Sequence, residues 1–298
     1  MTRLSILHET RYDYGRPVGF GPHRLLLRPR DSHAIRIVSA SLELAPGGQT
    51  RWIYDALGNC VCWLQPMGQA SSLIVTSRLL IERFPAPLAP MTLDDPRTVL
   101  PIVYDRSDRL VLEPFMAPAE DDPDDAVLRW ARGKLRPEDT ALDFVMRLNA
   151  DIHAQFDYSA RVAEGTQSPG ETLSHRSGTC RDFAWLMVEA LRRLGFAARF
   201  VTGYLYSAKL DPARDAEAAV RGAGATHAWC EVFLPDLGWT EFDPTNGLAE
   251  SPDLIPVAVT RTPDQAAPIS GAIVGDPQGS TLTVKVSVHA GEHLQAAA

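Results

Sequence analysis

The sequence predicts an α+β fold in which an all-β, sandwich-like domain precedes a core of helices and antiparallel strands. Three observations support this prediction. Apolar side chains recur with a period near two over residues 3–84, they recur at three and four over residues 140–194, and strand patterns return after residue 197. Because helices come first and hairpin-linked strands follow, the second half needs no crossover helices, which is typical of α+β proteins.

The N-terminal β-domain is expected to span residues 1–84. Gly, Pro and Asn separate its short apolar runs and tolerate the backbone angles of tight turns. The predicted strands are residues 4–14, 24–27, 35–44, 51–54, 60–64 and 72–84.

A proline-rich segment follows at residues 85–122, and we predict a surface connector with little regular structure there, because proline removes backbone donors. The acidic run after it is interpreted as a helix start, with Asp122 as N-cap and Pro123 as the first helical residue. An acidic interaction tail is the alternative. The second domain is then expected to span residues 123–290, with a tail at 291–298.

Helices of the second domain are predicted from apolar spacing and capping patterns. Ser168 to Glu171 has the form of a capping box, and the clearest helical periodicity begins at Cys180 and ends before Gly195. The predicted helices are residues 123–135, 140–156, 169–176 and 180–194, and the predicted strands are 197–205, 227–234, 239–243 and 280–289.

Composition limits the classes of function. The chain has 298 residues, of which 45% are hydrophobic, enough for one large domain or two smaller ones. Its net charge of −8 gives no electrostatic reason to expect nucleic acid or a membrane as a partner. The first residues lack the apolar stretch of a signal peptide, so we expect a cytoplasmic protein with reduced thiols.

The segment before the clearest helix is a candidate catalytic element. A thiol at a helix N-terminus meets the positive end of the helix dipole and unpaired N–H groups, which favour the thiolate and can receive an oxyanion. Cys180 is therefore a candidate nucleophile, and the alternative is a small buried side chain. Asp182 would disfavour the thiolate if it faced the sulfur, so we expect it to point away.

A histidine and an aspartate are expected to meet on neighbouring strands. Alternation places His227 and Cys230 on opposite faces, so Cys230 is interpreted as core. If Leu234 faces Gly238 across the hairpin, Asp243 is the diagonal neighbour of His227, about 7 to 8 Å away. A carboxylate there can accept the Nδ1 proton and stabilise the imidazolium.

Cys180, His227 and Asp243 together have the residue types that a thiol nucleophile, its base and an orienting carboxylate require. The segments 178–184, 226–232 and 238–246, which contain them, closely resemble the core motifs of the transglutaminase-like superfamily. The resemblance implies a papain-like α+β core with these residues in those three roles. Residues 8–14, 17–18 and 24–30 resemble the N-terminal β-domain that accompanies a bacterial subgroup of this superfamily, and the later stretch 264–271 is also similar to that subgroup.

These observations favour a cysteine-dependent enzyme that acts on amide bonds of a peptide or protein. The thioester formed on Cys180 can pass to water, as in a peptidase or amidase, or to an amine, as in a transglutaminase. We favour hydrolysis, because no dedicated amine site is evident. A non-catalytic interaction scaffold with the same fold is the alternative, and the sequence does not specify the oligomeric state.

No cofactor and no metal ion are expected. Cys60 and Cys62 share one face of a strand without a second ligand pair, so core packing is the better interpretation. Glu231 shares a face with His227 and either tunes it or forms a surface salt bridge. Tyr158 is considered as an oxyanion or substrate contact, and the long segment 207–225 as a lid or substrate-selecting wall.

Overall fold

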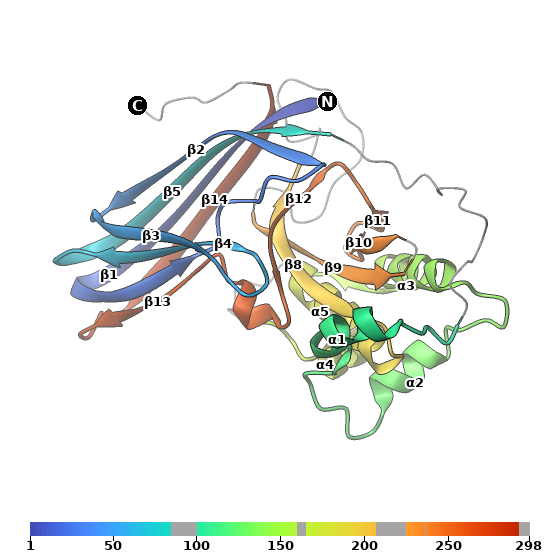
Figure 1. Ribbon diagram of the computed structural model, residues 1–298. Helices are drawn as coiled ribbons and strands as arrows, with labels where there is room; N and C mark the ends of the chain where they lie inside the picture. The colour runs from blue at the N-terminus through green and yellow to red at the C-terminus, as the bar shows by residue number, and fades with distance from the viewer. Residues whose placement is uncertain (85–99, 160–164, 207–224, 236, 292–298) are drawn as a thin grey trace.

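The computed structural model describes the chain except for residues 85–99, 160–164, 207–224, 236 and 292–298. Figure 1 shows a β-domain joined side by side to a second unit of helices and a smaller sheet, as the α+β prediction requires. The candidate lid at 207–225 and the tail at 291–298 lie, but for one residue each, outside the described residues.

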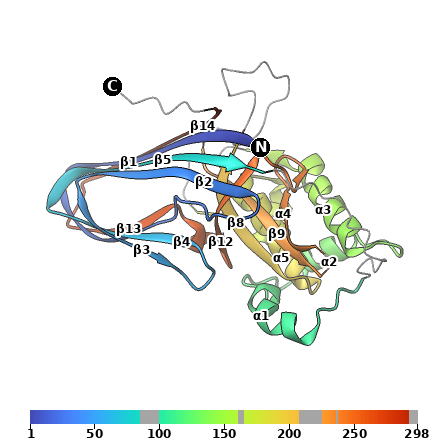
Figure 2. The same cartoon turned by 45° about the horizontal axis from the view of Figure 1, so that its top comes forward.

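The larger sheet is antiparallel and has seven strands: β1 (Thr2–Leu25), β2 (Ile35–Ala45), β3 (Gly48–Tyr54), β4 (Cys60–Pro66), β5 (Gln69–Arg83), β13 (Ile269–Val274) and β14 (Ser280–Ala290). The first half of β1 pairs with β5 and β14, and its second half pairs with β4 and β13. Because β1 bends between its halves, the sheet folds into two layers (Figure 2).

The two layers enclose an apolar core, to which β1, β4 and β5 all contribute buried side chains: Val18, Phe20, Leu25, Cys62, Leu64, Leu73 and Val75. This packing confirms the sandwich-like prediction. The boundary at residue 290 is different from the expectation, because β13 and β14 pair with β1 rather than with the second sheet. A strand periodicity shows that a segment is extended but not which distant strand it joins.

The second sheet has five strands in the order β11-β10-β9-β8-β12. Gly238 pairs with Leu234, so the predicted hairpin register is correct. The strands are β8 (Ala198–Leu205), β9 (His227–Leu234), β10 (Gly238–Asp243), β11 (Leu248–Ala249) and β12 (Leu254–Thr260). The sequence patterns did not predict β11, β12 or β13.

Five α-helices are present in the described residues: α1 (Arg106–Met116), α2 (Ala126–Arg132), α3 (Ala141–Gln155), α4 (Pro169–His175) and α5 (Cys180–Arg193). Short elements complete the core: β6 (Asp157–Tyr158), β7 (Ser177–Gly178) and the 3-10 helix η1 (Pro263–Ala266). None of the described helices has the length and apolar character needed to cross a membrane.

Two details around the connector differ from the prediction. The helix α1 lies within residues 85–122, where it begins after Asp105, whose side chain accepts the Asp108 N–H. Asp122 does not precede a helix at residue 123: α2 begins at Ala126, and the Asp122 carboxylate reaches forward to accept its first N–H groups. The prediction that Asp122 caps a helix was therefore correct, but the helix begins three residues later than predicted.

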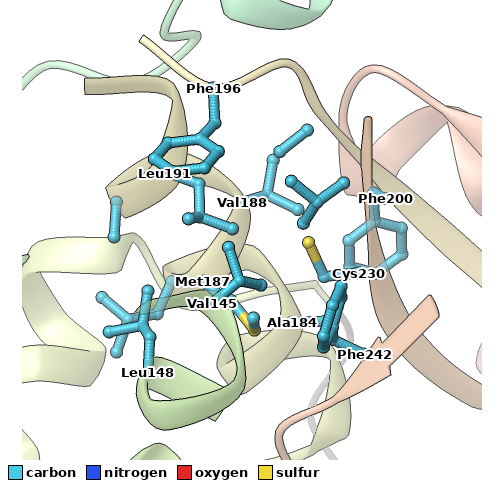
Figure 3. Packing of buried hydrophobic residues seen from close by; sticks show 14 of the residues in the cluster. Val145, Leu148, Ala184, Met187, Val188, Leu191, Phe196, Phe200, Cys230 and Phe242 are labelled. Carbon is cyan, nitrogen blue, oxygen red and sulfur yellow. The ribbon is translucent and has the colours of Figure 1, made fainter. Parts of the chain in front are cut away.

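The helix α5 is the centre of the core unit. Its apolar side chains pack against α3 and one face of the second sheet (Figure 3). Cys230 is fully buried in this cluster beside Phe200 and Phe242, which confirms its interpretation as a core residue. Burial of each phenylalanine stabilises the fold by about 2 kcal/mol, so this packing holds the N-terminus of α5 in place.

A second apolar cluster joins the β-domain to the core unit: Leu4, Ile6, Leu79, Ile81, Val286 and Val288 meet Tyr204, Ile255 and Val257. The Arg83 guanidinium adds hydrogen bonds to three carbonyl oxygens, those of Ser251 and Pro252 in the loop before β12 and that of Leu254, the first residue of β12. The β-domain therefore supports the end of β8 at which Gly203 pairs with His227 of β9.

Candidate active site

Cys180 is the first residue of α5, and 7% of it is exposed. The turn before it is closed by a capping interaction, in which the Asp182 carboxylate accepts the Thr179 N–H at 2.7 Å. Gly178 is required for this turn, because a Cβ there would lie 2.8 Å from the Asp182 Cβ. The sequence thus places the thiol at the positive end of the helix dipole.

The Asp182 carboxylate is held by Thr179 and Gln167, and its orientation relative to the thiol stays a prediction. One carboxylate oxygen accepts both the N–H and the hydroxyl of Thr179, and the other accepts the Gln167 N–H at 2.7 Å. The carboxylate charge is therefore spread over three donors, and the same contacts tie the segment before α4 to the start of α5.

His227 and Asp243 form a buried pair. Nε2 of His227 lies 2.9 Å from Oδ2 of Asp243, and both side chains are fully buried. The predicted contact is confirmed, but the prediction that Nδ1 faces the carboxylate is wrong. Asp243 lies diagonally across the hairpin and reaches the ring nitrogen farther from the His227 backbone. Nδ1 is buried and has no hydrogen-bond partner among the described residues.

The pair is arranged for a charged imidazole. Burial lowers the pKa of His227, but the Asp243 carboxylate, its hydrogen bond and the Cys180 side chain outweigh burial and raise the pKa to about 10. Burial raises the pKa of Asp243, but the charge and hydrogen bond of His227 and the bond from Asn246 produce a net lowering. The Cys180 side chain is among the groups that raise the pKa of His227, so Cys180 lies near the His227–Asp243 pair. The catalytic roles of the three residues stay a prediction.

Asn246 belongs to this site and was not singled out from the sequence. Its Nδ2 donates to Oδ2 of Asp243 at 2.8 Å, the oxygen that also faces His227. The Thr245 N–H donates to Oδ1 at 2.9 Å. An aspartate followed by polar residues in a turn is a pattern that favours such local bonds, so the signal was present.

The helix α3 holds this turn from the other side. Nδ1 of His153 is 2.8 Å from the Thr245 carbonyl oxygen, and Asn149 donates to the Leu248 carbonyl oxygen at 3.1 Å. Neither residue was predicted to contribute, because the spacing of α3 indicates only its apolar face. These two contacts anchor the turn that supplies Asp243.

Trp229 lies beside His227 on β9, with ring centres 6.0 Å apart. It is fully buried, and its Nε1 donates to Glu241 at 3.1 Å. Burial and the nearby Glu231 raise the pKa of Glu241 to about 8. Glu231 itself forms an ion pair with Arg199, but the glutamate is buried, so this is not the surface salt bridge that was predicted.

The remaining candidates lie around the site. Tyr158 is half-buried, and its backbone pairs with Gly178 two residues before Cys180. Cys60 and Cys62 are buried in the β-domain. Within the described residues, no group of three His, Cys, Asp or Glu side chains is arranged to hold a metal ion.

Comparisons with known proteins agree with the observed architecture. Residues 129–244 match the model of the transglutaminase-like superfamily, and residues 4–82 match that of the bacterial transglutaminase-like N-terminal region. A solved structure from Cytophaga hutchinsonii, described as a candidate cysteine protease, has the same fold. It aligns with a TM-score of 0.72 at 19% identity, over 99% of this chain and 92% of that one.

Curated relatives share the sequence over different lengths. An uncharacterized protein of Mycobacterium tuberculosis is 28% identical over 295 residues, covering 96% of this chain and 92% of the relative. A protein-glutamine gamma-glutamyltransferase of Pseudomonas aeruginosa is 34% identical over 116 residues, 38% of this chain and 16% of that protein. With both of its family regions matched in sequence and fold, the chain belongs to the transglutaminase-like superfamily.

Proposed function

We propose that the protein is a cysteine-dependent hydrolase of amide bonds in peptides or proteins. The observation that carries the proposal is the buried His227–Asp243 pair, with its ring and carboxylate 2.9 Å apart, next to a thiol at a helix N-terminus. A buried ion pair is costly to desolvate and is weak evidence for stability alone. A site that must hold an imidazolium beside a thiolate accounts for that cost.

In the proposed reaction the Cys180 thiolate attacks the amide carbon, and a proton from His227 goes to the leaving amine. The bond between carbon and nitrogen breaks, and a thioester on Cys180 remains. Water then attacks the thioester, with His227 taking its proton, and the carboxylic acid leaves with the thiol restored. Asp243 keeps the ring oriented and stabilises its charge throughout.

Transfer of the acyl group to an amine is the second candidate. It is favoured by the likeness of this chain to the Pseudomonas protein named as a protein-glutamine gamma-glutamyltransferase. In this case a primary amine replaces water in the second step, and an isopeptide bond forms instead of an acid. The first step and the roles of Cys180, His227 and Asp243 are the same.

A substrate screen with and without an added primary amine separates the two candidates. Released ammonia, cleaved peptide and incorporated amine are measured together for the wild type and for Cys180→Ala. Hydrolysis predicts products that do not depend on the amine and are absent in the variant. Amine incorporation would favour the second candidate, and full activity of Cys180→Ala would exclude both.

Iodoacetamide labelling near neutral pH tests the thiolate without a known substrate. Burial raises the pKa of the other three thiols, Cys60, Cys62 and Cys230, which makes them internal controls. We expect Cys180 to be modified first. Equal, slow labelling of all four would instead support an interaction scaffold. The proposed location is the cytoplasm, which cell fractionation with an antibody to the full chain tests.

A further inference from the structure

A positively charged aromatic surface lies on the β-domain, outside the candidate active site. The Arg28 guanidinium lies 5.9 Å from the ring centre of Trp52, and that of Arg30 lies 5.9 Å from the ring centre of Tyr54. Both rings face solvent, with 43% of Trp52 and 72% of Tyr54 exposed. We call these four residues the arginine–aromatic ladder.

The charge of the ladder is not neutralised within the described part of the chain. Neighbouring arginines are paired, Arg24 with Asp55 and Arg78 with Glu43. No ion pair is found for Arg28 or Arg30 among the described residues. On a chain whose net charge is −8, two unpaired guanidinium groups held on aromatic faces form a local site for an anionic group.

The ladder lies along a free strand edge. β3 is the terminal strand of its layer, and β2 is the terminal strand of the other layer on the same side. A terminal strand leaves one row of backbone N–H and C=O groups without a strand partner. Such an edge can accept an added strand from another chain.

An apolar recess opens beside the ladder. It lies between the two layers, and Arg28 and Trp52 form part of its wall together with leucines from both layers: Leu25, Leu27, Leu42 and Leu79. Trp52 pairs with the buried Cys62, so its ring extends the inner face of the sandwich out to the solvent. The recess can therefore receive an apolar side chain next to the charged groups.

We propose that the free edge of β3 binds an extended peptide segment with acidic side chains at alternate positions. Arg28 and Arg30 are separated by one residue, Pro29, whose ring restricts the backbone at this point. Side chains on one face of a strand also repeat every two residues, so two carboxylates of an added strand match two guanidinium groups. This site does not depend on the proposed reaction at Cys180.

Fluorescence anisotropy of a labelled peptide tests the proposal on the full chain. The probe is an extended peptide of alternating Glu and Thr that ends in Leu, and its counterpart with Lys in place of Glu is the charge control. We expect saturable binding of the Glu peptide, weakened about tenfold or more by Arg28→Ala/Arg30→Ala. Equal binding of the Lys peptide, or no loss in the double variant, would overturn the proposal.

Two controls separate the ladder from general charge and from folding. Arg51 is on β3, like Trp52 and Tyr54. Because it is the sequence neighbour of Trp52 and pairs with Trp63 of β4, its side chain lies on the opposite face of the sheet from the ladder. Arg51→Ala should therefore leave the affinity within about twofold. Arg28→Lys/Arg30→Lys keeps the charge but loses the planar fork, so an intermediate loss at an unchanged melting temperature supports carboxylate recognition.

A modified probe tests strand addition itself. Methylation of alternate backbone nitrogens removes the donors on one edge of the peptide without changing its charge. One of the two methylation patterns should abolish binding and the other should preserve it. If both patterns bind equally, or if dextran sulfate displaces the peptide through the same arginines with equal affinity, the site recognises anionic polymers by charge and the peptide proposal is wrong.

Discussion

His8 and His227 are both buried, with 1% of each residue exposed. His8 lies where the β-domain meets the core unit, with the Tyr204 hydroxyl at 3.0 Å and the Thr10 hydroxyl at 2.9 Å. Burial lowers its pKa to about 4. His227 has the carboxylate of Asp243 as its partner, and its pKa is raised to about 10. Near neutral pH the His8 ring is therefore neutral and the His227 ring is protonated.

The difference between the two histidines comes from their partners rather than from depth. Hydroxyl groups satisfy a neutral ring, but they do not offset the cost of burying a charge. A carboxylate does offset it. The chain thus places a charged imidazole at the start of β9 and a neutral one at the domain interface, which makes His8 an internal control for His227.

The largest expected effect follows from removing the carboxylate. In Asp243→Asn, the His227 ring loses its counter-charge and should behave like His8, with a pKa below the ordinary value. We expect kcat/KM on the substrate found in the screen to fall by about 10⁴-fold. As the matched control, His8→Gln should change kcat/KM by less than about twofold, because it does not touch Cys180.

Iodoacetamide labelling adds a second readout for the Asp243→Asn variant. Labelling of Cys180 should slow, because the imidazolium that stabilises the thiolate is lost. An Asp243→Asn protein that folds, turns over substrate and labels at the wild-type rates would show that the pair is only structural.

The two histidines should act on opposite sides of the stability profile. Between about pH 4 and 6.5 the unfolded chain binds the His8 proton and the native chain does not, so stability falls as the pH falls. Between about pH 6.5 and 10 the native chain binds the His227 proton more tightly, so stability falls as the pH rises. Each group contributes at most about 1.4 kcal/mol per pH unit.

Urea unfolding of the wild type, His8→Gln and His227→Gln at about pH 5, 7 and 9 checks both predicted directions of the change in stability with pH. His8→Gln should flatten the acid side and leave the alkaline side unchanged. His227→Gln should do the reverse. If one variant flattened both sides, or neither, the assignment of the two pKa directions would be incorrect.

The sequence predicted the contact between His227 and Asp243 because one hairpin register determines it. The pairing of Gly238 with Leu234 is local, and the turn residues specify it. The ring nitrogen that faces Asp243 depends on side-chain torsions, which strand alternation does not determine. That is why the prediction of Nδ1 failed while the prediction of the contact succeeded.

Contacts between residues far apart in the sequence were harder to predict. Leu4, Ile6 and His8 alternate on one face of β1, and this pattern indicates that His8 is buried. Its partner Tyr204 is 196 residues away in the sequence, and no local pattern predicts which distant residue His8 contacts. The same limit explains why residues 280–289, which form β14, were assigned to the second domain and why β13 was not predicted. Both strands pair with β1 only because the chain returns to it near its end.

Asn246→Ala should have a smaller effect than the loss of Asp243. The substitution removes the Nδ2 bond to Oδ2 of Asp243 and so favours the protonated carboxyl, while His227 keeps its partner. We expect kcat/KM to fall about 10- to 30-fold, with the acid limb of its pH profile moved to higher pH. A fall in stability without any movement of the pH profile would assign Asn246 to the fold alone.

The smallest effect is expected at the interface that holds His8. Tyr204→Phe removes the hydroxyl that faces Nδ1 of His8 at 3.0 Å and the Leu27 carbonyl oxygen at 3.3 Å, so one buried ring nitrogen loses its partner. We expect the free energy of unfolding to fall by about 1–3 kcal/mol, with kcat/KM unchanged. Gly203, the neighbour of Tyr204, pairs with His227 on the adjacent strand. Kinetics on the folded variant therefore reveal whether the interface also positions the active ring: a tenfold loss of kcat/KM would show that the two histidines are coupled through β8 and are not independent sites.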